Sequence, residues 1–151
     1  MSEYWDVYTK DRIKTGRRHE RGISLVEGDY HIVVLVGIID DSCRILITKR
    51  HQEKTWPNLW ECTGGSILMN EESLDGAVRE VKEETGINLN RNDGELVFSY
   101  IGEDTIYDVW AFYKNINLNE IILQENEVID IDFVNTDKLK NLFKNSGLYC
   151  Q

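Results

Sequence analysis

The sequence predicts an α/β protein with a mixed β-sheet packed between helices. Three observations support this: β-branched segments occur in both halves of the chain, an amphipathic helical segment lies between them, and a second helical segment follows the last strand. The 151 residues can bury roughly 70% of their unfolded surface around one core. We therefore expect a single domain over residues 1–151, without repeats or linkers.

The expected strands are short apolar runs bounded by turn residues. Residues 31–40 and 44–50 are rich in β-branched side chains, and the polar residues 40–42 favour a turn that pairs them. The first run lacks polar alternation, which predicts burial on both faces. The segment from His51 to Thr63 contains the only proline and is expected to be a loop. Further strands are expected at residues 95–101, 105–114, 120–123 and 128–134.

The central helix has a marked start and a marked end. Asn70 can cap its first turn, and Gly86 can end it because glycine adopts the left-handed conformation without strain. A second helix is expected to begin at the cap residue Thr136. The apolar side chains Leu139, Leu142 and Phe143 share one face of that helix.

The central helix carries three acidic residues on one face. At about 100° per residue, Glu80, Glu83 and Glu84 fall within about 100° of one another, opposite the apolar stripe that docks on the sheet. Such runs also occur on solvated helix faces. Like charges repel, and Lys82 points away from them, so a bound divalent cation would compensate. Carboxylates and water are the ligands of Mg²⁺, and Mn²⁺ is possible.

Charge excludes several kinds of partner. The formal net charge of -10 disfavours a nucleic-acid polymer and an anionic membrane, since both are bound through Lys and Arg. The basic segment from Lys10 to Arg21 is the exception, with six Lys and Arg residues. It could contact a polyanionic substrate, pack across a homodimer or form a solvated β-turn.

Cysteine usage and hydropathy favour the cytoplasm. Cys43, Cys62 and Cys150 are odd in number and lack CxxC spacing, so neither a disulfide framework nor a zinc site is expected. The first ten residues lack the apolar core of a signal peptide. The longest apolar run, Ile32 to Ile39, is too short to cross a membrane.

Read with its flanks, the helix follows the pattern G-x5-E-x7-R-E-U-x-E-E-x-G-U, where U is a bulky aliphatic residue. The matching residues are Gly65, Glu71, Arg79, Glu80, Val81, Glu83, Glu84, Gly86 and Ile87. This pattern resembles the Nudix box at every position. The resemblance implies an α/β/α sandwich with a mixed sheet. It also implies hydrolysis of a nucleoside diphosphate linked to another moiety.

The resemblance also implies roles for individual residues. Metal-binding acids would be Glu80, Glu83 and Glu84, with the backbone carbonyl of Gly64 as a further ligand. Arg79 and Glu71 would orient these acids by ion pairing. The proton of the attacking water would pass to Glu83 or to one of the loop acids Glu125 and Glu127. Arg50, Lys54 and Gly65 are candidates for contact with a small diphosphate substrate.

Two other functions remain open at this point. The amino-terminal segment is similar to the opening of isopentenyl-diphosphate-isomerase-like Nudix members, although those enzymes place a Cys and a His where this chain has Gly64 and Ser66. A noncatalytic nucleotide-binding module is the other alternative. The intact set of box acids favours hydrolysis over both. Nucleoside di- and triphosphates, nucleotide sugars and other diphosphates all fit as substrates.

Overall fold

The computed structural model describes residues 1–147 and confirms a mixed α/β fold. The main sheet has the strand order β5-β4-β3-β8-β7, with β6 paired to β3 and β9 paired to β4. Strands β3 and β8 are parallel, and the other pairs in this sheet are antiparallel. Its strands are β3 (His31–Ile39), β4 (Ile45–Arg50), β5 (Trp60–Glu61), β6 (Thr63–Ser66), β7 (Glu95–Ile101), β8 (Thr105–Tyr113) and β9 (Val128–Val134).

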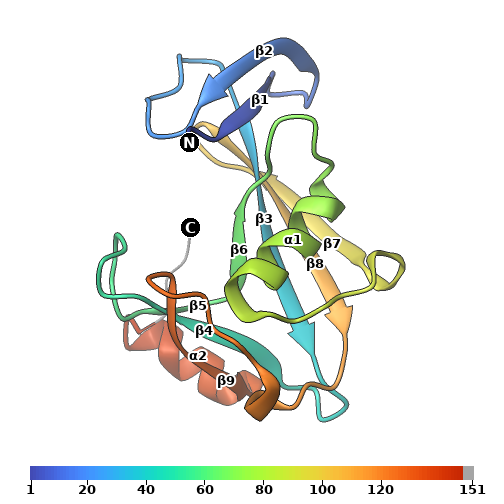
Figure 1. Cartoon of the computed structure of the whole chain (residues 1–151), viewed down its shortest axis with the longest axis vertical. Coiled ribbons are helices and arrows are strands. Elements are labelled where there is room, and N and C mark those ends of the chain that lie inside the picture. Colours follow the sequence, from blue (N-terminus) through green and yellow to red (C-terminus); the bar gives the residue numbers. More distant parts are fainter. Residues whose placement is uncertain (148–151) are drawn as a thin grey trace.

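Two helices pack on this sheet. Helix α1 (Ser73–Thr85) contacts β3, β6 and β8, and helix α2 (Thr136–Lys144) contacts β9 (Figure 1). The core lies between α1 and the sheet, where Ala77, Val81 and Val34 are fully buried because the apolar stripe of α1 faces β3. Strand β3 is buried along most of its length, as its unbroken apolar sequence predicts.

A separate hairpin of β1 (Tyr4–Tyr8) and β2 (Lys14–Glu20) lies at the upper end of the molecule in Figure 1. These strands are absent from the sequence expectations because β2 is polar throughout. The hairpin joins the rest of the fold through reciprocal backbone hydrogen bonds between Tyr8 and Tyr30. No helix within residues 1–147 is long and apolar enough to span a bilayer.

The helix ends differ in part from the expectations. Gly86 ends α1 in the left-handed region with φ of 73°, as predicted. Asn70 does not cap α1: Glu72 precedes the first helical residue, without a side-chain cap, and Asn70 lies in a turn where its N–H donates to Asp6. Thr136 is the first residue of α2 rather than its cap, since the side chain of Asn135 accepts from the Lys138 N–H.

Two segments depart from the predicted element types. Residues 120–123 are not a strand: the 3₁₀ turn Leu118–Glu120 includes the first of them, and the Ile122 N–H donates to the Thr85 carbonyl at the end of α1. A second 3₁₀ turn is found at Arg91–Asp93. The predicted loop 51–63 ends in β5 and the first residue of β6. Cys150 lies outside the described residues.

Candidate active site

The three acidic side chains of helix α1 differ in solvent exposure. Glu84 is only 4% exposed, and its Oε2 atom is buried without a hydrogen-bond partner in the part of the chain described here. Glu80 is half-buried, whereas the Glu83 side chain is 48% exposed. The acidic face therefore runs from solvent at Glu83 to the protein interior at Glu84.

Burial changes the ionisation of the two inner acids. It raises the pKa of Glu84 to about 8, because a buried carboxylate loses its hydration. Burial also raises the pKa of Glu80, although the charge of Arg79 opposes the shift. A cation bound between these groups would favour their ionised forms.

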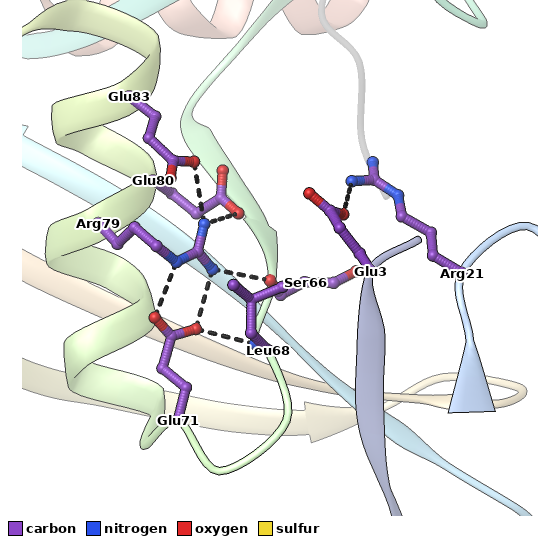
Figure 2. A network of polar contacts seen from close by, with 8 residues as sticks. All are labelled: Glu3, Arg21, Ser66, Leu68, Glu71, Arg79, Glu80 and Glu83. Carbon is purple, nitrogen blue, oxygen red and sulfur yellow. Dashed lines mark hydrogen bonds and ion pairs between the residues drawn. The ribbon is translucent and has the colours of Figure 1, made fainter. Parts of the chain in front are cut away.

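Arg79 places a positive charge among the acids of α1 (Figure 2). Its Nη1 atom donates to Glu80 at 2.9 Å and to Glu83 at 3.0 Å, and its Nη2 atom donates to the Ser66 carbonyl at 3.1 Å. Arg79 thus makes the ion pairs expected with Glu80 and Glu83, whereas Lys82 donates to the Gly86 carbonyl at the end of the helix. Glu84 is the acid that Arg79 does not reach.

Glu71 fixes the position of Arg79. Its two carboxylate oxygens accept from Arg79 Nε at 2.7 Å and Nη2 at 2.9 Å, and Oε2 also accepts from the Leu68 N–H at 2.8 Å (Figure 2). The ion pair expected between Glu71 and Arg79 is thus present. It links the loop before α1 to the acids in the middle of the helix.

Gly64 and Gly65 bring the backbone of β6 close to the acids. A Cβ atom at Gly64 would lie 2.1 Å from the Val34 carbonyl oxygen, and one at Gly65 would lie 2.4 Å from Glu80 Oε1. Neither position has room for a side chain in this arrangement. The close approach leaves polar backbone groups of β6 beside Glu80 as further ligand candidates.

A second group of charges lies around Lys54. Its Nζ atom is 2.6 Å from Glu127 Oε2 and 3.9 Å from Glu61 Oε1, and its charge also acts on Glu84. Burial raises the pKa of Glu61, with Arg50 opposing the shift. The structure therefore brings Lys54 and Glu127 to the acidic site, together with Glu61. Sequence reasoning missed Glu61, which stands alone between Trp60 and Cys62 without a spacing signal.

Arg50 and Glu125 are placed differently from the other candidates. Arg50 is 7% exposed, and its guanidinium donates to Glu61 at 2.6 Å and to the Thr55 carbonyl at 2.6 Å. These bonds assign Arg50 to holding the loop after β4, in place of the expected contact with substrate phosphates. Glu125 is exposed, whereas Glu127 is half-buried and paired with Lys54.

The donor set fits a hard divalent cation. Within residues 1–147, no three acidic, His or Cys side chains are arranged as a metal site, and Glu80 and Glu83 are turned toward Arg79. The unpartnered Glu84 oxygen, the adjacent Glu80 and the exposed Glu83 nevertheless supply the carboxylate oxygens that Mg²⁺ and Mn²⁺ prefer.

A family model, the NUDIX domain, matches residues 29–149. The chain belongs to the Nudix family. A Nudix hydrolase of Listeria monocytogenes, itself uncharacterized, is 38% identical over 147 residues, which cover 96% of this chain and 86% of the relative. This Nudix protein is accordingly a pyrophosphohydrolase, and Nudix hydrolases generally use divalent metals.

Solved structures share the Nudix fold. A Deinococcus radiodurans crystal structure superposes with a TM-score of 0.81 at 15% identity, covering 99% of this chain and 93% of that one. A bifunctional NMN adenylyltransferase/ADP ribose pyrophosphatase of Francisella tularensis was solved with AMP and a Mn ion. It matches with a TM-score of 0.59 at 24% identity, covering 75% of this chain and 36% of that one.

Proposed function

We propose that this protein is a divalent-metal-dependent hydrolase that cleaves the diphosphate linkage of a nucleoside di- or triphosphate or a related nucleoside diphosphate derivative. The observation that carries the proposal is the buried, unpartnered carboxylate oxygen of Glu84 beside Glu80. A buried ionised carboxylate needs a compensating partner, and a divalent cation supplies one. Mg²⁺ is the proposed metal, with Mn²⁺ as a substitute.

Glu80, Glu83 and Glu84 would hold the metal, together with the carbonyl of Gly64. When bound, the metal supplies neutralisation of phosphate oxygens and a lower pKa for its coordinated water. Arg79, fixed by Glu71, would keep Glu80 and Glu83 close to this site through the hydrogen bonds it donates to them. Removal of the Arg79 charge would leave those acids misplaced.

Glu83 and Glu127 are the proposed acceptors of the water proton. Glu83 is the most exposed acid of the face, so water can reach it, and Glu127 lies 2.6 Å from Lys54 beside the same site. Glu127 is favoured over Glu125 because its pairing with Lys54 places it beside the site. Lys54 is the proposed cation for a substrate phosphate, and Gly65 is the proposed backbone contact for the substrate, since its missing side chain lets β6 pass close to Glu80.

A nucleotide panel tests this function. Purified protein is incubated with nucleoside di- and triphosphates, nucleotide sugars and isopentenyl diphosphate, with Mg²⁺, with Mn²⁺ or with EDTA, and the products are resolved by mass. We expect metal-dependent cleavage of a diphosphate bond. Glu83→Gln should lower turnover at least about a hundredfold, whereas Glu72→Gln, just before the same helix and 79% exposed, should not.

Two outcomes would contradict the proposal. One is the absence of any cleavage with either metal. The other is full activity of Glu83→Gln at saturating Mg²⁺, which would remove Glu83 from the mechanism. Conversion of isopentenyl diphosphate to its allylic isomer would support the isomerase alternative instead.

A further inference from the structure

The amino-terminal hairpin lies beside the acidic face. The Met69 N–H, in the loop that leads into α1, donates to the Tyr4 carbonyl of β1 at 2.8 Å. Glu3 precedes β1, and Arg21 follows β2. Figure 2 shows this Glu3–Arg21 pair on the hairpin, across from the acids of α1. The hairpin thus places one cation and one anion at the border of the proposed catalytic site.

Most cations of the basic segment are committed to other partners. Arg12 pairs with Asp108, Lys14 with Asp6 and Arg17 with Asp29, and the Arg18 guanidinium lies over the Tyr4 ring at 4.7 Å. These contacts hold the hairpin and its connections together. They assign most of the segment to structure, and Lys14–Glu20 forms a strand rather than the solvated β-turn that was one of the expectations.

Arg21 is held more weakly than its neighbours. It pairs with Glu3 at 2.5 Å, but the two side chains are 62% and 48% exposed, and exposed pairs of this kind contribute about 0–1 kcal/mol. A stronger anion can therefore displace Glu3.

We propose that Arg21 is a substrate-binding residue whose guanidinium leaves Glu3 and binds a phosphate oxygen of the diphosphate at the acidic face. This proposal rests on the proposed hydrolase function and extends it. Arg79 and Arg50 already donate to carboxylates and backbone carbonyls, and Lys54 is paired with Glu127 at 2.6 Å. A guanidinium suits this role because its paired N–H groups match two phosphate oxygens.

Because Arg21 is paired with Glu3, removal of each charge should change phosphate affinity in an opposite direction. In the free protein Glu3 competes with the substrate for Arg21. Loss of the Glu3 charge should strengthen phosphate binding, whereas loss of Arg21 should weaken it. A hairpin with a purely structural role would not produce opposite effects from the two partners of one ion pair.

Calorimetry with methylenediphosphonate, a diphosphate analogue that is not hydrolysed, tests the proposal. The 151-residue chain is titrated in saturating Mg²⁺ as wild type, Arg21→Ala, Glu3→Gln and Arg17→Ala. Arg17 is the matched control, because it is an exposed arginine of the same segment paired with Asp29. Melting temperatures of all four proteins establish that the fold is retained.

We expect Arg21→Ala to weaken binding at least about tenfold, Glu3→Gln to strengthen it by about two- to fivefold, and Arg17→Ala to leave it unchanged. Wild-type affinity in Arg21→Ala overturns the role of Arg21, while nucleotide cleavage by the wild type keeps the hydrolase proposal standing. A wild type that neither cleaves the nucleotide panel nor binds the analogue overturns both. Binding that depends on Arg21 without cleavage supports the phosphate site and contradicts the hydrolase.

Discussion

Arg79 binds the carboxylate of Glu71 with two nitrogens, Nε at 2.7 Å and Nη2 at 2.9 Å, and uses its third nitrogen for Glu80 and Glu83. One end of the guanidinium is therefore anchored in the loop before α1, and the other end holds two acids of the proposed metal site. Glu71 acts on these acids through Arg79 rather than by touching the metal.

Glu71→Ala should reduce activity while retaining the fold. Without its carboxylate anchor, Arg79 can follow Glu80 and Glu83 and compete with the metal for them. We expect kcat to fall about 10- to 100-fold and the Mg²⁺ concentration for half-maximal activity to rise. Glu72→Ala is the control, since Glu72 contacts Arg91 on the outer surface. An equal loss of activity in both variants would contradict this role of Glu71, because it would show that any change at the start of α1 lowers activity.

Alanine at the two adjacent glycines should have different effects. At Gly64 the new methyl group would meet the Val34 backbone carbonyl at 2.1 Å, which cannot move without disturbing β3. We expect a loss of about 2–4 kcal/mol of stability in chemical denaturation.

At Gly65 the methyl group would meet the flexible end of Glu80 at 2.4 Å. Gly65→Ala should therefore change stability by less than about 1 kcal/mol and should weaken Mn²⁺ binding. Equal destabilisation at both positions would contradict this assignment.

Asp108 should contribute strongly to stability. It is 0% exposed and accepts hydrogen bonds from Arg12, Ser73 and Ser99, which joins the hairpin connection, the start of α1 and β7. Asp108→Ala leaves these donors without their acceptor and should destabilise the protein by about 3 kcal/mol. Arg17→Ala, which breaks an exposed pair, should change stability by less than about 1 kcal/mol. Urea unfolding compares the two.

The buried His31 ring should make the folded protein less stable in acid. Its ring stacks on Trp5 at 4.1 Å, and burial lowers its pKa from 6.5 to about 4. The folded state therefore disfavours the protonated ring, while the unfolded chain takes up a proton below its ordinary pKa. Stability from this group is complete above about pH 6.5 and falls as the pH drops toward 4.

The change in unfolding free energy between pH 7 and pH 4.5 measures this effect. His31→Asn should show a smaller drop than wild type, whatever its stability at pH 7. His51→Asn serves as the control because His51 lies in the loop after β4. The same pH dependence in wild type and His31→Asn would contradict the account.

Local signals in the sequence predicted much of this fold. Strand β3 follows from an unbroken apolar run, and the end of α1 follows from the left-handed conformation of Gly86. Both features depend on residues close together in the sequence, and the structure confirms both. The polar strand β2 could not be found, because cross-strand contacts such as Lys14–Asp6 stabilise it instead of an apolar pattern. Residues 120–123 resemble a strand in composition, yet they bond to the end of α1.

In the candidate site, too, the sequence predicted what local geometry determines and missed what tertiary contacts determine. Spacing alone placed Glu80, Glu83 and Glu84 on one face, since helix geometry fixes that relation. Partners brought by tertiary structure could not be predicted: Glu61 for Arg50 and Glu127 for Lys54 come from other strands and loops.

Titration of Mn²⁺ into the metal-free protein tests the central claim most directly. Calorimetry is performed on wild type, Glu84→Gln and the control Glu72→Gln. We predict that wild type and Glu72→Gln bind Mn²⁺ alike, with affinity rising from pH 6.5 to pH 8 because the Glu84 proton, with a pKa of about 8, must leave. Glu84→Gln should bind at least about tenfold more weakly. Equal affinity in all three proteins would contradict a metal site on this face of α1.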